Sequence, residues 1–370
     1  MNLKKGIGVI SLVLILCLSM VGCGSNTTVE QKPTIEDFNN EIVVDTTNNE
    51  EKIENSEVVE NNSEVETPSV PEEVAGLLGD IEVKFIDVGQ ADSCLIVTAN
   101  NDAILIDAGE DRDAEAIIEV IAEYDIPNID LMVLTHPHAD HIGGAQTIIE
   151  TYKVEEVMMC SYAATSKLFN NLLTALEEST STVVTQATVG LEKEVDGVEL
   201  LVVGVDSEPK DNNNSSIVMK VTYGTVDMLF TGDAEVPAEE VILQNGFDLS
   251  AELLKVGHHG SDTSTSDAFL EAISPKVAVI SVGEGNKYNH PSDMILKKFM
   301  DKGIQYYRTD ELGTITLEID GKDIVTSIED NFEAVNARSG SFIYAPNVAE
   351  IELELESVVI ENQEGLKSEN

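Results

Sequence analysis

Half of the six histidines in this chain stand in one ten-residue stretch, THPHADHIGG, at positions 135–144. This stretch holds His136, His138 and His141 together with Asp140. The other three histidines lie in KVGHHGS and YNHPSD, as His258, His259 and His290. Imidazoles and carboxylates grouped in this way are the usual ligands of zinc, or of manganese or iron where carboxylates dominate. The distribution therefore predicts a metal site.

The elements around these residues predict how they are positioned. The histidine stretch follows the apolar run 129–134, which predicts a buried strand, and Gly143 and Gly144 lead into a helix. Asp233 likewise follows a strand-like run in TVDMLFTGD, and the histidine pair follows ELLKVG. A loop directly after a buried strand is held at its base, so its side chains can converge on one point.

Strand-like and helix-like patterns divide the region 79–328 into two halves. Strands are predicted at 81–88, 92–99, 103–109, 129–135, 154–160, 181–187, 198–205, 215–223, 225–233, 252–257, 277–283, 304–310, 313–319 and 323–328, and helices at 112–126, 143–152, 166–179, 238–246, 266–274 and 292–303. Strands open each half and helices follow, which predicts two packed sheets with helices outside, an α/β (α+β) fold.

The first 23 residues have the pattern of an export signal. Lys4 and Lys5 precede an apolar run that is short for a membrane span, and Gly22 stands directly before Cys23. This resembles a bacterial lipoprotein signal, which predicts lipidation of Cys23 and anchoring at the cell membrane, facing the extracellular side. A plain secretory signal with an incidental cysteine is the alternative.

Composition limits the rest of the chain. Residues 24–78 are polar and acidic, which predicts a disordered linker, and 329–370 are an acidic tail or an edge extension of a sheet. The net charge is −48, and between Asp80 and Asp323 about 45 acidic and 15 basic residues leave roughly −30. This charge argues against tight binding to long nucleic acid or to anionic membrane. Cys94 and Cys160 lie in apolar runs, which predicts buried free thiols.

The motif HPHADH matches the H-x-H-x-D-H signature of the metallo-β-lactamase fold. With FIDVGQADSCLI, LIDAG, NNNSSIVM, LFTGDAE, LLKVGHHGSDTS, NKYNHPS and YRTDELGTI, in this order, the region 80–325 looks like the metallo-hydrolase domain of ComEC-type DNA-uptake proteins. The resemblance implies a four-layer αββα sandwich with two divalent metal ions at one edge, zinc or, alternatively, manganese.

The resemblance also implies a ligand set. It assigns His136 and His138 to the first ion, Asp140, His141 and His259 to the second, and Asp233 to both. Within the histidine pair, His259 is favoured as the ligand and His258 as a pocket group, although the reverse order stays open. Asp107 is expected to be buried and to orient the metal loop, and Asp87 and Asp92 either to do the same or to form turns.

The sequence departs from the fold's common pattern in one respect. No histidine lies between His141 and His258, where many relatives place a further ligand of the first ion. The first ion would then have only His136, His138 and Asp233. Substrate-binding roles are expected for polar side chains near the missing ligand and after the histidine pair: Asn214, Ser215 and Ser261.

Catalytic roles are expected for His258, His290 and Asp140. His290 would hydrogen-bond an anionic substrate or protonate a leaving oxygen, or else it would cap the helix that follows. Lys287 and Arg308 would add positive charge nearby or be solvated surface residues.

Two metal ions lower the pKa of a shared water and stabilise developing negative charge, which predicts a hydrolase. The resemblance favours a cell-surface phosphodiesterase or nuclease-like enzyme, with nucleic acid as a substrate and not as a high-affinity partner. Alternatives are a phosphorylcholine esterase, a lactonase or β-lactamase-type hydrolase of the same fold, or a non-catalytic metal-binding surface lipoprotein. Contact with the membrane is expected through the N-terminal lipid only.

Overall fold

The computed structural model of the protein describes residues 79–206, 208 and 210–325. The predictions for the signal 1–23 with Cys23, for the linker 24–78 and for the tail 329–370 lie outside the described residues. None of the helices in the described part is both long and apolar enough to cross a membrane.

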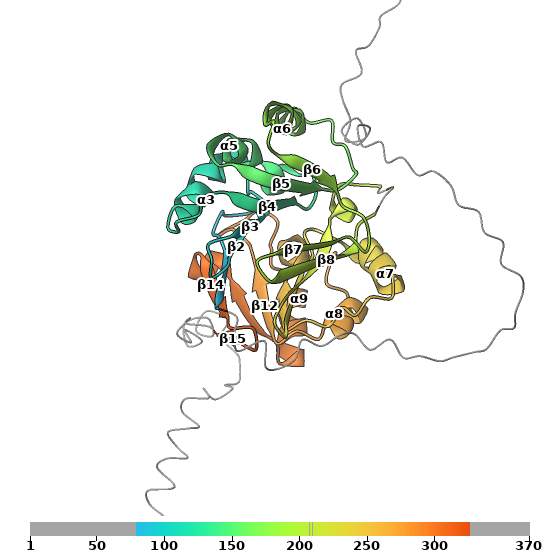
Figure 1. Cartoon of the computed structure of the whole chain (residues 1–370). Coiled ribbons are helices and arrows are strands. Elements are labelled where there is room, and N and C mark those ends of the chain that lie inside the picture. The colour runs from blue at the N-terminus through green and yellow to red at the C-terminus, as the bar shows by residue number, and fades with distance from the viewer. Residues whose placement is uncertain (1–78, 207, 209, 326–370) are drawn as a thin grey trace, which may run out of the picture.

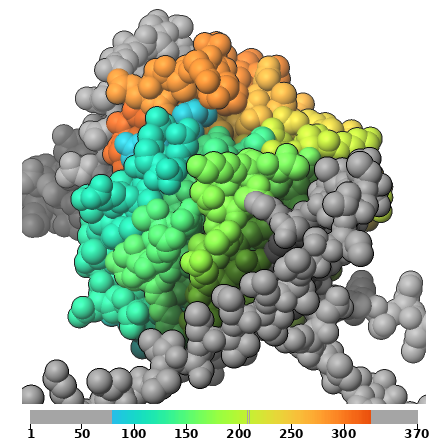
Figure 2. Space-filling view, turned by 90° about the horizontal axis from the view of Figure 1, so that it is seen from above, coloured from blue at the N-terminus to red at the C-terminus, as the bar shows by residue number. Residues whose placement is uncertain are grey.

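The first sheet has eight strands. They are β1 (Ile81–Phe85), β2 (Cys94–Val97), β3 (Ala103–Ile106), β4 (Ile129–Leu134), β5 (Val154–Met159), β6 (Val183–Gln186), β14 (Ile315–Ile319) and β15 (Ile324–Val325). Their order across the sheet is β15-β14-β1-β2-β3-β4-β5-β6, and the strands from β3 to β6 run parallel. β1 pairs antiparallel with β14, so the start of the described chain (blue) lies against its end (orange) in Figure 2.

The second sheet has seven strands. They are β7 (Glu192–Val195), β8 (Val198–Gly204), β9 (Val218–Tyr223), β10 (Val226–Phe230), β11 (Leu253–Lys255), β12 (Val277–Ile280) and β13 (Gln305–Arg308). Strands β7 to β10 form an antiparallel meander, and β10 to β13 run parallel. Both sheets therefore contain a parallel part, and the carboxyl ends of parallel strands are where α/β folds usually carry their sites.

Helices cover the outer faces of both sheets (Figure 1). The first sheet is covered by α3 (Ala114–Ile121), α5 (Ala145–Thr151) and α6 (Lys167–Glu178), and the second by α7 (Val236–Gln244), α8 (Asp267–Ile273) and α9 (Asp293–Lys302). Ser166, Ser266 and Ser292 begin α6, α8 and α9 by accepting a backbone N–H of the first turn with their hydroxyls. Short helices are η1 (Asp111–Asp113), α4 (Ala139–Ile142), η2 (Asn213–Ser215), η3 (Gly257–Gly260) and α10 (Thr309–Leu312).

Three apolar layers join the four structural layers. In β1, Ile81, Val83 and Phe85 are buried between the sheets, and Phe85 stacks on Phe230 of the facing sheet with ring centroids 6.1 Å apart. Two further clusters lie between each sheet and its helices. The predicted αββα sandwich is confirmed, and Cys94 and Cys160 are buried free thiols as expected. The short helix α4 and the strand β7 were not predicted.

Candidate metal centre

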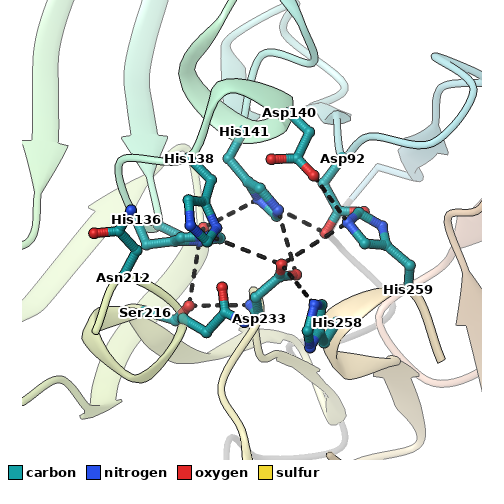
Figure 3. A network of polar contacts seen from close by, with 12 residues as sticks. Asp92, His136, His138, Asp140, His141, Asn212, Ser216, Asp233, His258 and His259 are labelled. Atoms are coloured by element: carbon teal, nitrogen blue, oxygen red, sulfur yellow. Dashed lines mark hydrogen bonds and ion pairs between the residues drawn. The ribbon is translucent and has the colours of Figure 1, made fainter. Parts of the chain in front are cut away.

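Three loops at the carboxyl ends of β4, β10 and β11 bring the candidate ligands together (Figure 3). The loop after β4 contains α4, which begins at His138 and carries Asp140 and His141. Gly143 and Gly144 let this loop pack tightly, because a Cβ at either position would collide with the backbone of neighbouring segments. The histidine stretch is therefore held between the sheet and the chain before α3.

The first half-site consists of His136 and His138. His136 Nε2 lies 2.9 Å from His138 Nδ1 and 3.8 Å from Asp233 Oδ2. Two imidazoles that bind one tetrahedral zinc at 2.0–2.1 Å place their nitrogens about 3.3 Å apart. On its other side, His136 Nδ1 faces the hydroxyls of Thr135 and Ser216, each at 3.3 Å.

The second half-site consists of Asp140, His141 and His259. His141 Nε2 lies 3.3 Å from Asp233 Oδ1, and His259 Nε2 lies 3.5 Å from Asp140 Oδ2 and 3.8 Å from Asp233 Oδ2. These separations match those of donor atoms that share one ion. His259 Nδ1–H donates to the carbonyl of Ser281 at 3.0 Å, which leaves Nε2 as the nitrogen that faces the site.

A carboxylate orients His141. Its Nδ1–H donates to Asp107 Oδ2 at 2.7 Å, and the same carboxylate accepts the backbone N–H and the hydroxyl of Thr135, each at 2.8 Å. Asp107 is buried, as predicted, and a histidine held by a carboxylate in this way is typical of metal ligands. Asp87, in contrast, accepts the backbone N–H of Gly89 and forms a turn.

The donor set fits two ions. His141 Nε2, His259 Nε2 and Asp233 Oδ1 are buried without a hydrogen-bond partner in the described structure, which is costly unless a ligand completes them. Asp233 lies in the centre of the network in Figure 3. Its carboxylate forms one group of donors with His136 and His141 and another with Asp92 and His259, and Asp140, His141 and His259 form a third; within each group the donor atoms lie within 4.8 Å of one another. This arrangement is consistent with a binuclear centre that Asp233 bridges.

Protonation separates the two half-sites. Burial lowers the pKa of His136 well below 6.5, and it also lowers the pKa of His138. Burial opposes the charged form of His141 and His259 too, but the carboxylates around them outweigh it. Asp233 and Asp107 raise the pKa of His141 well above 6.5, and Asp233 and Asp92 raise that of His259 to about 10. Ions at the second half-site would therefore displace protons, as ligand binding to metals commonly does.

The histidine pair is split by the turn η3. His258 has a φ of 48° and His259 a φ of 54°, a left-handed conformation that costs about 1–3 kcal/mol per non-glycine residue. This turn directs His259 into the buried site and His258 to the solvent-exposed edge of the site, which we call the mouth. The His258 side chain keeps 23% exposure. There His258 Nε2 lies 3.8 Å from Asp233 Oδ2, and its Nδ1 lies 3.2 Å from Glu235 Oε1.

His290 lies beside His258 at the mouth, with ring centroids 5.5 Å apart. Asn286 holds it by accepting its backbone N–H and donating to its carbonyl, and its Nδ1 has no partner among the described residues. Burial lowers the pKa of His290. The cap of α9 is Ser292, so the expected alternative role of His290 as a helix cap is wrong.

Lys287 and Arg308, the two side chains expected to add positive charge near the site, differ in whether carboxylates already neutralise them. Lys287 is exposed and lies 4.9 Å from the ring centroid of Tyr288, which in turn stacks on His290. Arg308 is instead engaged by Asp310 and Glu311 at 2.7 and 3.0 Å. Positive charge near the site can therefore come from Lys287, and Arg308 belongs to a half-buried ion-pair cluster.

The structure does not bring the expected substrate-binding residues to the ligands. Asn214 Oδ1 accepts the backbone N–H groups of Glu235 and Ala238 at the start of α7, and its amide nitrogen donates to Asp211. Ser215 is fully buried and donates to the carbonyl of Asn212.

Ser261 was expected to bind substrate but is engaged within its own turn, whereas Ser216, for which no role was expected, faces a candidate ligand. Ser261 shares a hydrogen bond with Thr263 inside its own turn. Ser216, one residue beyond Ser215, accepts the backbone N–H of Asp233 at 3.0 Å and faces His136. The turn η2 determines which of the consecutive serines points to the site, and no pattern in the sequence shows that direction.

Sequence reasoning also missed Lys255, the last residue of β11. Its Nζ lies 2.7 Å from Asp92 Oδ2, and both residues are at most 5% exposed. Asp92 Oδ1 lies 3.4 Å from His259 Nδ1. The sequence did contain a signal for this role: the lysine interrupts the apolar run ELLKVG, which leads into the histidine pair.

Comparisons with known proteins agree with this site. Residues 86–284 match the model of the Metallo-beta-lactamase superfamily. The chain is 29% identical over 252 residues to ComE operon protein 3 of Bacillus subtilis, covering 63% of this chain and 32% of that protein. It is 32% identical over 233 residues to Competence protein ComA of Neisseria gonorrhoeae, covering 62% and 31%. The match thus spans about a third of the length of these relatives.

Among solved structures, the metallo-beta-lactamase fold protein YhfI of Bacillus subtilis is similar, with a TM-score of 0.44 and 12% identity, covering 65% of this chain and all of that one. The family model covers the histidine stretch, Asp233 and the histidine pair, which form the buried His/Asp site. This chain belongs to the metallo-beta-lactamase superfamily of hydrolases, and its domain is related to a domain of competence proteins.

Proposed function

We propose that this protein is a metal-dependent phosphodiesterase of the cell surface, attached to the membrane by lipid on Cys23. The observation that carries the proposal is the set of His and Asp donors grouped around Asp233. Two further imidazoles, those of His258 and His290, lie beside this set at the mouth. Paired divalent ions and a nearby proton donor both promote cleavage of a phosphodiester.

The residues divide between holding ions and moving protons. The ions would be held by His136 and His138, by Asp140, His141 and His259, and by Asp233 between them. Two divalent ions supply a nucleophilic water at neutral pH and offset the charge that develops on the phosphoryl group.

The imidazoles at the mouth would transfer a proton to the leaving oxygen. His258 Nδ1 lies 3.3 Å from the hydroxyl of Thr263, which itself donates to Glu235, and 3.2 Å from Glu235 Oε1. Its Nε2 is then on the ion side, 3.8 Å from Asp233 Oδ2. His290 lies edge-on to the same ring. An alkoxide leaving group needs a proton, and an imidazole held within reach can provide it.

Nucleic acid is the proposed source of the diester. Two relatives are named as competence proteins or products of a ComE operon, and a third, Recombination protein 2 of Haemophilus influenzae, is 29% identical over 222 residues. Their whole-protein activities do not transfer, because the match covers 32%, 31% and 26% of their lengths. The −30 charge between Asp80 and Asp323 repels a long polyanion, so short or locally presented strands are the proposed substrates.

A substrate panel tests the proposal. The zinc- or manganese-loaded protein should hydrolyse bis(p-nitrophenyl) phosphate and a short single-stranded oligonucleotide, but not a phosphorylcholine ester, a lactone or a chromogenic β-lactam. Asp140→Ala should lose this activity, while Asp301→Ala, which removes an exposed carboxylate from α9, should retain it. Activity on lactones or β-lactams alone would reject the diester. A folded, metal-loaded protein without any activity would favour the non-catalytic surface lipoprotein.

Ionic strength separates charge repulsion from chemistry. Added salt should increase turnover of a long single strand, because it screens the acidic body beyond a Debye length of about 8 Å near 0.15 M. Turnover of bis(p-nitrophenyl) phosphate should hardly change. If salt slows the long strand instead, the proposed preference for short substrates is wrong.

Membrane attachment is tested by fractionation of cells. The wild-type protein should sediment with membranes and be accessible to protease added outside the cell. Cys23→Ser should be released into the medium or remain unprocessed. A wild-type protein found in the cytoplasm would contradict this part of the proposal and leave the enzymatic part intact.

A further inference from the structure

A buried ion pair next to the metal centre has no role in the function proposed above. Lys255 Nζ donates to Asp92 Oδ2 at 2.7 Å and to the carbonyl of Val256 at 3.1 Å. Lys255 is 5% and Asp92 is 4% exposed. Charged groups are rarely buried to this extent, because they must give up their hydration, and such a pair often serves specificity more than stability.

The pair connects the two sheets at the edge that carries the site. Asp92 lies two residues before β2 in the first sheet, and Lys255 is the last residue of β11 in the second. The backbone of Asp92 also contacts the ligand loop, since its N–H donates to the carbonyl of Asp140 at 3.0 Å and its carbonyl accepts the N–H of Gly109 at 2.8 Å. Asp92 thus contacts both the loop that bears Asp140 and the strand end that leads to His259.

The second oxygen of Asp92 lies beside His259. Asp92 Oδ1 is buried without a hydrogen-bond partner in the described part of the chain and lies 3.4 Å from His259 Nδ1. Its carboxylate also groups with Asp233 and His259, with all three donor atoms within 4.8 Å. A carboxylate in this place has two uses: it can support His259 from behind, or it can turn and bind an ion itself.

We propose that Lys255 decides between these two uses and is a positioning residue of the second half-site. Its ammonium holds Asp92 Oδ2, and this keeps the carboxylate beside His259 and out of the coordination of the ion. His259 and Asp140, which come from opposite sheets, then face the ion as the intended pair, 3.5 Å apart. Asp107, by comparison, is held by the neutral donors of Thr135 and lies behind His141.

Without the ammonium, the buried Asp92 carboxylate keeps only the imidazoles of His141 and His259 beside it in the described structure. Once these imidazoles hold ions, the ions are its countercharge. It should rotate toward them and add an oxygen ligand to the second half-site. More oxygen ligands and a higher coordination number favour manganese over zinc. The proposal requires that ions bind at this site, but it does not require that the substrate is a phosphodiester.

Cobalt-loaded protein provides the test, because the visible bands of Co²⁺ weaken when its coordination number rises above four. Lys255→Met should weaken the band of the second ion and shift the ratio of the zinc and manganese dissociation constants toward manganese by about tenfold or more. Lys255→Met/Asp92→Asn should return the spectrum to that of the wild type, because an amide is a poor replacement for the carboxylate ligand.

Lys220→Met is the matched control. Lys220 forms an ion pair of the same 2.7 Å length with Asp227 in the same sheet, away from the ligands, and its loss should change neither the spectrum nor the ratio. A folded Lys255→Met protein with the wild-type spectrum and ratio would overturn the proposal. If that variant does not fold, Asp92→Asn decides: the second ion should bind about 10–100-fold more weakly. A change below threefold would overturn the proposal.

Wild-type stoichiometry distinguishes this failure from the failure of the function proposed above. If the wild-type protein binds two ions and Lys255→Met behaves like it, only the positioning role is wrong. If the wild-type protein binds no ion, the metal-dependent hydrolase and the positioning role are both wrong.

Discussion

The two half-sites differ in what supports their imidazoles. Behind His136, among the described residues, lie the hydroxyls of Thr135 and Ser216, each 3.3 Å from Nδ1. Behind His141 lies the Asp107 carboxylate at 2.7 Å. A carboxylate partner fixes the ring and raises the basicity of the ligand nitrogen, whereas a hydroxyl does so weakly.

The ligand charge differs in the same direction. The second half-site has its own carboxylate, Asp140, and a further carboxylate, Asp92, beside His259, whereas the first half-site shares only Asp233. We expect the second half-site to bind its ion more tightly. The first half-site, which lacks the third histidine of many relatives, would then have the more exchangeable ion and the more open coordination.

The strongest test of the shared element is Asp233→Ala. This change removes the carboxylate that contacts both half-sites, so both ions should be lost and activity should fall by roughly 10³-fold or more. Elemental analysis of the purified protein measures the first effect and a diesterase assay the second. If the variant still holds two ions, Asp233 is not the bridge, and the half-sites are independent.

Asp107→Asn should separate the half-sites. The asparagine keeps the shape but weakens the support of His141, so the second ion should bind about 10–100-fold more weakly while the first is nearly unchanged. Competition with a chelator of known affinity measures both constants. Equal weakening of both ions would mean that Asp107 supports the whole loop and not His141 in particular.

Proton release should differ between the ions. The raised pKa values of His141 and His259 mean that binding at the second half-site displaces up to about two protons near neutral pH, whereas the lowered pKa values of His136 and His138 leave nothing to displace. The affinity for the second ion should therefore rise with pH and that for the first should stay flat above pH 6.5. Calorimetric titration in buffers of different ionisation enthalpy measures the protons.

The same shift predicts the pH dependence of the chelator-treated protein. Because the pKa of folded His259 is raised from 6.5 to about 10, its contribution to stability is fully present below pH 6.5 and is lost as pH rises through 10. The Tm of the chelator-treated protein should fall over this window, and less so for His259→Gln. An equal fall in both would assign the effect to other groups.

Ser216→Ala should have the smallest effect. It removes a hydroxyl that faces His136 and accepts the N–H of Asp233, so the first ion should bind about two- to tenfold more weakly, while the second is unchanged. Ser215→Ala is the matched control, because its side chain is directed away from the ligands. If the affinity for the second ion falls more than the affinity for the first, Ser216 supports the second half-site and the prediction is wrong.

The sequence predicted that the candidate ligands meet at one place, because their positions at strand ends follow from local pattern. The apolar run before Thr135 and the runs before Asp233 and His258 each predict a buried strand, and buried parallel strands end at a common edge. The αββα fold followed from the same alternation and from the family resemblance.

Contacts between the sheets could not be predicted in this way. The approach of Lys255 to Asp92 depends on how two sheets pack, and these residues are 163 positions apart. Whether Ser215 or Ser216 faces His136 depends on the conformation of the turn η2, and a shift of one residue in that turn would exchange them. The export signal and the lipid on Cys23 stay predictions, because they lie outside the described residues.

The most direct test of the asymmetric centre is a stepwise titration of chelator-treated protein with cobalt or zinc against a competing chelator. Two binding steps should appear, with dissociation constants that differ by at least about tenfold. Asp140→Ala should remove the tight step, and His138→Ala should remove the weak step. Two equal steps, or a tight step that disappears in His138→Ala and survives in Asp140→Ala, would contradict the account.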